Sequence, residues 1–190
     1  MSKLFRDGSG LKISGPGLAN IADKLRKTAE ARVLVGVPES NANRPSEPGQ
    51  PINNAVLGYI HEFGAPEANI PARPWLVPSI RQNEAKLAVA MRRATITALD
   101  PQQSANTDKL LEQVGMLAVG YVKSYIRAGL EPPLAERTLA GRAARGRKGA
   151  AQELENRRLG MAPSTALAKP LIDTGAFLRS INYIVDRGGK

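Results

Sequence analysis

The stretch NNAVLGYIHEFGAPEANIPARPWLVPSI, from Asn53 to Ile80, decides how the chain folds. It begins with apolar residues at helical spacing, which predicts a helix that starts near residue 53. Gly64 follows the last of them, and glycine is the residue that most often ends a helix in a left-handed conformation. Prolines then punctuate residues 65–74, and a second, longer helix is expected to start at Pro74 and Trp75. The stretch is therefore predicted to be a helix, a rigid elbow and a helix, with the chain's only tryptophan at the joint.

The chain before this stretch predicts a strand, a helix and a strand. Residues 11–14 alternate and are followed by Gly-Pro-Gly, which suits an edge strand or an arm. Residues 18–29 carry apolar side chains at three- and four-residue spacing, typical of a helix. Residues 33–37 are rich in β-branched side chains and end at Pro38, which favours a buried strand. Residues 39–52 change to Ser, Asn, Pro and Gly, and we predict a surface loop there.

The chain after the elbow predicts two amphipathic helices and a closing strand. The helix that follows Trp75 is expected to stop at Asp100-Pro101, and a second helix runs from residue 107 or 108 to Gly129, which makes an antiparallel hairpin. A short helix follows Gly175, and residues 182–186 alternate as a strand that would pair with residues 33–37. The predicted fold class is α+β. Residues 1–190 form a single domain in which a small mixed or antiparallel sheet, made of N-terminal strands plus the C-terminal strand, packs against two or three amphipathic helices.

Residues 130–168 have weak periodicity and are predicted to be a flexible, basic, insertion-like loop. Within it, residues 137–148 contain five cations and no acid. This segment would contact DNA phosphates without reading sequence, contact an acidic protein surface, or remain solvated, and the sequence does not favour one of these over the others. The candidate contact residues are Arg137, Arg142, Arg145, Arg147 and Lys148.

Composition narrows the classes of function. The 190 residues carry a net charge of +10, which favours a polyanion or an acidic protein as partner. The absence of cysteine removes disulfides, thiolate metal sites and thiol nucleophiles. No apolar run is long enough for a signal peptide or a membrane span, so we expect neither secretion nor a membrane, and assembly in the cytoplasm. No nucleotide motif is present, and we predict no cofactor and no metal.

Two short motifs invite a catalytic interpretation and are better explained by structure. His61-Glu62 offers an imidazole and a carboxylate, but adjacent helical positions point to different faces, so we expect a hydrogen bond to the elbow. Asp173-Thr174-Gly175 matches the tripeptide of aspartic proteases, which need two such carboxylates. It occurs once here and precedes a helix, so we expect Asp173 or Thr174 to cap that helix. An acid protease that acts as a dimer is the remaining alternative interpretation.

An ordered set of motifs resembles one known family. Residues 59–64 (YIHEFG) followed by residues 70–76 (IPARPWL), and then residues 169–175 (KPLIDTG) leading to residues 180–185 (SINYIV), resemble the tail-completion, or head–tail joining, proteins of long-tailed, lambda-like bacteriophages. Residues 132–134 and 138–139 resemble the segment that this family places between them. The direct matches cover about 60 residues. Trp75 departs from the phenylalanine expected at its position, and the first 50 residues match no motif.

The resemblance implies a structural virion protein and not an enzyme. It implies a ring, a hexamer, at the top of the tail that joins the tail to the head around the DNA passage. The implied partners are the head connector and the tail-terminator or tail-tube proteins. The tail terminator of the same neck is an alternative assignment, and a sequence-independent basic DNA-binding protein is another. The residues carried over as fold and interface determinants are Phe63, Gly64, Arg73, Pro74, Trp75, Asp173, Thr174 and Gly175.

Overall fold

The structure is a computed structural model, and it describes residues 4–7, 10–13, 23, 26, 30–42, 52–100 and 102–187. The N-terminal strands β1 (Leu4–Asp7) and β2 (Gly10–Ile13) pair antiparallel with each other. The strand predicted over residues 11–14 therefore forms, but in a hairpin separate from the main sheet. The helix predicted over residues 18–29 lies mostly outside the described residues. In the predicted loop at 39–52, Glu39–Ala42 form the short helix α2, and residues 43–51 lie outside the described part.

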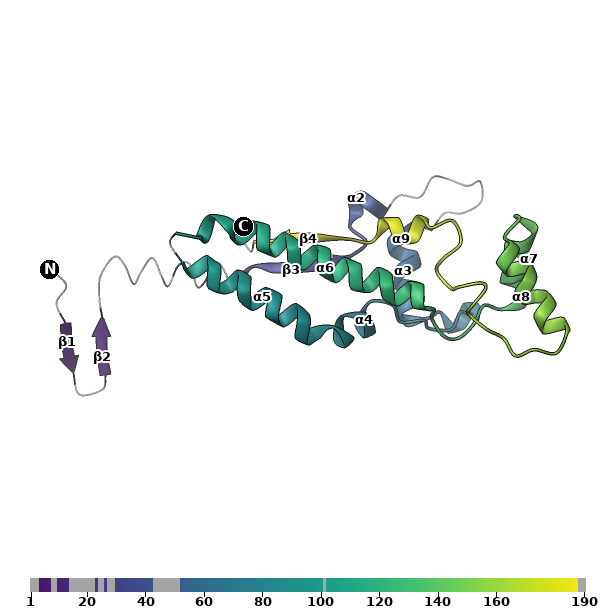
Figure 1. The fold of residues 1–190 in the computed structure, drawn as a ribbon, viewed down its shortest axis with the longest axis horizontal. Helices are drawn as coiled ribbons and strands as arrows, with labels where there is room; N and C mark the ends of the chain where they lie inside the picture. Colours follow the sequence, from purple (N-terminus) through teal and green to yellow (C-terminus); the bar gives the residue numbers. More distant parts are fainter. Residues whose placement is uncertain are drawn as a thin grey trace.

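The fold is α+β, and its main sheet pairs β3 (Arg32–Gly36) with β4 (Asn182–Asp186). The strands are antiparallel, in a register that sets Leu34 opposite Ile184, so the predicted pairing of these two segments is confirmed. Side chains alternate across the sheet: the neighbours of Leu34 and Ile184 turn inward, whereas these two residues are exposed on the outer face. The prediction of a buried strand over residues 33–37 is therefore wrong, because the described residues cover only one face of the sheet. The inner face packs on the long helix α6 (Thr107–Ala128), which runs alongside both strands (Figure 1).

The helix predicted after Trp75 is interrupted once. It divides into α4 (Val77–Gln82) and α5 (Glu84–Leu99), since Asn83 leaves helical geometry and its side chain donates to the Ser79 carbonyl at 3.0 Å. The short helix η2 (Ser104–Asn106) then leads into α6. α5 and α6 pack as the predicted hairpin, with the sheet on α6 (Figure 1). Proline at residue 74 does not start the helix: α4 begins at Val77, with Pro78 in its first turn.

Gly115 permits the close contact between α6 and the sheet. A β-carbon at this position would lie 2.2 Å from Cδ2 of Tyr183 on β4, whereas a β-carbon at Gly120, on the same helix, would meet nothing within 4 Å. We expect Gly115→Ala to destabilise the protein by about 2 kcal/mol through overpacking. Gly120→Ala should instead stabilise it by about 0.5 to 1 kcal/mol through helix propensity. Urea unfolding of both variants checks this, and equal effects at the two positions would contradict the predicted packing.

The first helix of the elbow and its stop at Gly64 form as the sequence predicts. Helix α3 (Asn54–Phe63) is capped by Asn53, whose side chain accepts from the Val56 amide at 2.9 Å. Gly64 ends the helix with φ 79°, and a β-carbon there would lie 2.9 Å from the backbone nitrogen of Ala72. Glycine is therefore needed both for its conformation and for the close approach of the returning chain. The short helix η1 (Pro66–Ala68) completes the loop.

The principal core surrounds Trp75. The Trp75 indole donates to the Gly58 carbonyl at 2.9 Å, and its ring meets that of Phe177 edge to face, with centroids 5.1 Å apart. Phe177 belongs to α9 (Ala176–Ser180), so the elbow and the C-terminal segment share one core. Burial of these aromatic rings is a large part of the hydrophobic stabilisation available to a chain with few aromatics. The buried members of this cluster are Trp75, Val122, Ile126, Leu130, Leu171, Phe177, Leu178 and Ile181.

The prediction of an irregular loop over residues 130–168 is wrong. The segment contains α7 (Glu136–Ala144) and α8 (Lys148–Arg158), which pack on each other and lie at one end of the molecule (Figure 1). Alanine supplies high helix propensity here, and Gly146, with φ 77°, makes the turn between the helices. The two helices bury only a narrow apolar stripe, which is why the sequence shows weak periodicity. That small cluster consists of Leu134, Leu139, Ala150 and Ala168.

Candidate functional site: an arginine-lined pocket

The segments that carry the family resemblance meet in space. The residues after α3, the start of α7 and the turn that precedes α9 line a common pocket of about 370 Å³. Its polar wall contains His61, Arg73, Arg142, Arg145 and Asp173. Its other walls are largely apolar. Because these residues come from three separate parts of the chain, the pocket exists only in the folded protein, and we consider it the candidate functional site.

Glu62 holds the elbow in place beside this pocket. Its carboxylate accepts from the backbone amides of Trp75 at 2.7 Å, Leu76 at 2.9 Å and Val77 at 3.1 Å. These amides lie at the N-terminus of α4, where backbone donors have no helical partner and negative charge is favoured. The predicted hydrogen bond from the His61-Glu62 pair to the elbow is therefore present, and the carboxylate of Glu62 provides it.

Arg73 ties the elbow to the segment before α7. Its Nε donates to the Pro132 carbonyl at 2.7 Å and its Nη2 to the Pro133 carbonyl at 2.9 Å. The side chain is only 5% exposed. Burial lowers the pKa of Arg73, although the negative charge of Glu131 opposes that shift. Both hydrogen-bonding partners are neutral carbonyls, so this buried guanidinium makes no ion pair in the part of the chain that the structure describes.

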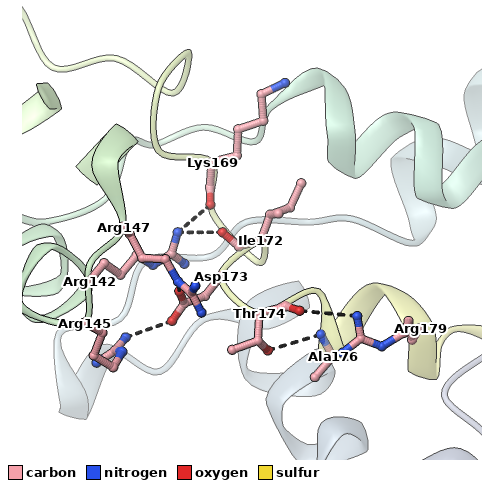
Figure 2. A network of polar contacts seen from close by, with 9 residues as sticks. All are labelled: Arg142, Arg145, Arg147, Lys169, Ile172, Asp173, Thr174, Ala176 and Arg179. Carbon is pink, nitrogen blue, oxygen red and sulfur yellow. Dashed lines mark hydrogen bonds and ion pairs between the residues drawn. The ribbon is translucent and has the colours of Figure 1, made fainter. Parts of the chain in front are cut away.

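Arg142 ties α7 to the C-terminal turn in a similar way. Its Nη1 donates to the Lys169 carbonyl and to the Ile172 carbonyl, both at 2.8 Å (Figure 2). The residue is 8% exposed. Burial is the largest cause of its lowered pKa, which Asp173 partly counteracts. The sequence suggested a solvated cation or a DNA contact at this position, and the structure instead buries it against backbone carbonyls.

Asp173 is the acidic centre of the cluster. Arg145 Nη2 donates to one carboxylate oxygen and Arg147 Nε to the other, both at 2.8 Å (Figure 2). Burial alone would raise the pKa of Asp173, but the hydrogen bonds from Arg147 and Arg145 outweigh it and the pKa is lowered. These two arginines close the turn between α7 and α8, so the aspartate holds the helical hairpin against the body of the protein.

The prediction named Asp173 or Thr174 as the cap of α9, and neither residue occupies the cap position. Gly175, with φ 77°, occupies the cap position, and the Thr174 hydroxyl accepts from the Ala176 amide at 3.2 Å. The Thr174 carbonyl accepts from Arg179 at 3.3 Å. Asp173 points the other way, because two charge-assisted hydrogen bonds to arginine are stronger than one bond to a backbone amide. With both of its oxygens held by arginines, this carboxylate is not arranged like the proton-sharing pair of an aspartic protease.

His61 lines the pocket and should make folding depend on pH. Its Nδ1 is buried without a hydrogen-bond partner among the described residues. Its pKa falls from 6.5 to about 4, first because of burial and then because of the positive charges of Arg73 and Arg142. Below pH 6.5 the unfolded chain takes up a proton at His61 that the folded chain does not. The folded state therefore loses stability as the pH falls from 6.5 to about 4. The full shift in pKa corresponds to at most about 3 kcal/mol. Because His61 is partly exposed, we expect a loss of about 2 kcal/mol.

Urea unfolding at several pH values between 4 and 6.5 checks this window. His61→Gln, which cannot titrate, should flatten the dependence of the free energy of unfolding on pH. The lowered pKa of Asp173 acts at more acidic pH, since its contribution is lost only below the ordinary carboxyl value of 3.8. A glutamine variant that loses stability as steeply as the unmodified chain would show that His61 does not titrate in this way.

Two of the predicted DNA-contact residues remain available. Arg137 and Lys148 are exposed, and neither has a hydrogen-bond or ion-pair partner in the described parts of the chain. Arg142, Arg145 and Arg147 are instead engaged within the protein. The structure thus divides the basic segment into three cations that bond within the protein, of which Arg145 and Arg147 are also exposed, and two exposed cations without such a bond.

Helix α3 presents an exposed apolar ridge next to the pocket. Phe63 is 63% exposed and Tyr59 is 67% exposed, and their ring centroids lie 4.8 Å apart. Val56 lies one turn before Tyr59 on the same helix, and Ile52 precedes the helix; both are also exposed. We call Ile52, Val56, Tyr59 and Phe63 the α3 ridge. Of the residues carried over from the family, Gly64, Arg73 and Trp75 are explained by the fold, whereas Phe63 and Pro74 lie on the surface.

No group of three or more potential metal-ligating side chains occurs in the described portion of the chain. Within the same residues, no helix is both long and apolar enough to cross a membrane. Comparison of the chain with protein-family models, with curated proteins and with solved structures finds no match.

The sequence did not predict the ion pairs that Arg145 and Arg147 make with Asp173. The individual residues were recognised, but each was assigned to a separate role. One signal was present. All the charged residues of the segment 137–148 are cations, and Asp173 is an acid that follows later in the chain. That signal does not specify a contact, because opposite charges far apart in a sequence meet only when the fold brings them together.

Proposed function

We propose that this chain is a structural protein of the bacteriophage neck, a tail-completion protein that joins the tail to the head around the DNA passage. The observation that carries the proposal is the ordered set of motifs over residues 59–64, 70–76 and 169–175. Its support from the structure is that these motifs lie together: the pocket walls draw on all three segments, and Trp75 meets Phe177 in the helix that follows the third. Motifs that form one unit are more specific than three unrelated short matches.

The proposed mechanism is assembly of a ring through contacts between unlike faces of neighbouring copies. The α3 ridge supports this, because apolar residues exposed together on a helix usually mark an interaction surface. The net charge of +10 adds attraction to acidic neighbours or to DNA. A tail terminator of the same neck would also assemble by contacts between neighbouring copies. Both assignments therefore belong to this proposal.

The test of this proposal is to image virions assembled with and without the chain. Full heads and finished tails that fail to join would support the neck assignment. Normal, infectious particles in its absence would overturn it. A monomeric chain whose DNA affinity falls steeply with salt would instead favour a basic DNA-binding protein, and Arg137 and Lys148 are the cations of residues 137–148 without a partner among the described residues.

The role of the α3 ridge can be tested with a matched pair of variants. Phe63→Ser should prevent ring formation on a sizing column while leaving thermal unfolding of the monomer nearly unchanged. Val89→Ser is the control, since Val89 is also exposed, on α5, but stands outside the ridge. If both variants still form rings, the ridge is not the contact between subunits.

A further inference from the structure

The pocket contains two buried positive charges, Arg73 and Arg142, with which no carboxylate of the described residues pairs directly. Arg73 and Arg142 hydrogen-bond only to neutral carbonyls, and both are more than nine-tenths buried. Asp173 accepts from Arg145 and Arg147, one at each oxygen, and among the described residues it makes no hydrogen bond to Arg73 or Arg142, although its negative charge acts on Arg142 through space. Arginine stays charged in proteins, so these side chains cannot become neutral to relieve the cost of burial.

Both guanidinium groups keep donors that face accessible space. Each guanidinium carries five N–H donors. The Nη1 of Arg73 and the Nε and Nη2 of Arg142 have no acceptor among the described residues. None of these three atoms is among the fully buried atoms that lack a partner, so each keeps some access to solvent. Arg73 and Arg142 both line this pocket, and Arg142 also lines a second pocket together with Lys148 and Leu167. The pocket therefore presents unused donors that fit the planar, two-oxygen geometry of a carboxylate.

The remaining walls of the pocket indicate which chemical group would accompany a bound carboxylate. Leu57, Leu134, Leu171 and Phe177 line the same space of about 370 Å³. Burying an apolar group against these side chains would add favourable free energy, whereas a hydrated inorganic anion gains nothing from them. A phosphate of duplex DNA has no adjoining apolar group to place there. A carboxylate carried on an apolar scaffold uses both kinds of wall.

We propose that this pocket is a binding site for an acidic side chain with an apolar neighbour, presented by a partner protein. The carboxylate would bridge Arg73 and Arg142, and the neighbouring apolar group would lie against Leu134 and Phe177. Binding would hold the elbow and the α7 helix against each other, because one arginine belongs to each. The inference does not require that the chain be a neck protein, and it fits any assembly in which the partner surface is acidic.

Small molecules that carry the negative charge and the apolar group together or separately test which of them the pocket binds. Hexanoate combines a carboxylate with an apolar chain, hexanamide lacks the charge, and inorganic phosphate lacks the apolar part. At pH 7 and constant ionic strength, hexanoate should shift the side-chain NMR signals of Arg73 and Arg142 in a saturable way. Its affinity should exceed that of phosphate at least tenfold, and hexanamide should produce no shift. Tighter binding of phosphate or of a short DNA duplex than of hexanoate would overturn the proposal.

A charge placed at the pocket supplies the matched control. Thr138 lines the pocket from α7 and is exposed, so its replacement should not unfold the protein. Thr138→Glu would put a carboxylate near the arginines and should weaken hexanoate binding at least tenfold. Thr138→Gln has nearly the same size without the charge and should bind hexanoate as the unmodified chain does. Equal affinity of the two variants would contradict a site that recognises charge at Arg73 and Arg142.

Discussion

Replacement of Glu62 by alanine is expected to destabilise the protein by about 4 kcal/mol, the largest effect of any single substitution considered. The carboxylate accepts three backbone hydrogen bonds at the start of α4. Without it, the amides of Trp75, Leu76 and Val77 lose their acceptor, and the Trp75 amide is buried with its residue. The alanine also leaves a void beside the principal core. Chemical unfolding followed by circular dichroism measures the loss.

Two further variants separate charge from shape at this position. Glu62→Gln keeps one acceptor oxygen but replaces the other with an amino group, which cannot accept from a backbone amide. It should cost about 2 kcal/mol, roughly half of the alanine effect. Glu67→Ala is the surface control, because Glu67 is an exposed acid of the same elbow, and it should change stability by less than about 0.5 kcal/mol. Equal losses in the Glu62 and Glu67 variants would show that Glu62 does not cap α4.

Replacement of Arg142 by methionine is expected to cost about 3 kcal/mol. The methionine keeps the apolar stem, so the loss reports the two hydrogen bonds from the guanidinium to the Lys169 and Ile172 carbonyls. Those bonds connect α7 to the turn before α9. The α7–α8 hairpin has its own small apolar cluster, separate from the core around Trp75. We therefore expect the attachment of the hairpin to weaken more than the hairpin itself.

Hydrogen exchange distinguishes this local effect from general unfolding. In Arg142→Met, amides in α7, α8 and residues 169–175 should exchange faster, while those in α5 and α6 keep most of their protection. Arg137→Met is the matched control, since Arg137 lies on the same helix but is exposed and has no partner in the described residues. It should leave both stability and exchange nearly unchanged. Uniform loss of protection across α5, α6 and α7 in Arg142→Met would contradict a hairpin held mainly by polar contacts.

The elements predicted correctly from the sequence are those with local physical causes. Asn53 and Gly64 bound α3, because a side-chain cap and a left-handed glycine act within a few residues of the helix ends. The β-branched residues over 33–37 and the alternation over residues 182–186 were enough to predict two strands that pair, because side chains that share one face of a sheet are buried together. The long stripe of apolar residues on α6 predicted its helix for the same reason.

The α7 and α8 helices were not predictable in this way. Their apolar stripe is short, and arginines and alanines dominate the segment, with three glycines among them. Helices with so little buried surface become stable only when they pack against each other and are held to the rest of the protein. That condition depends on Asp173 and on the carbonyls of Lys169 and Ile172, which lie far along the chain.

The sequence by itself determined the α+β class, the elbow, the pairing of the first and last strands of the main sheet, and the residue types at the candidate site. Only the tertiary structure decided what those residues do. It buried Arg73 and Arg142, turned Asp173 away from the helix it precedes, and left Arg137 and Lys148 in solvent. The physical reason is that a helix or strand end is stabilised by neighbours in sequence, whereas the partner of a long charged side chain is fixed by whichever carbonyl or carboxylate the fold brings within hydrogen-bonding distance.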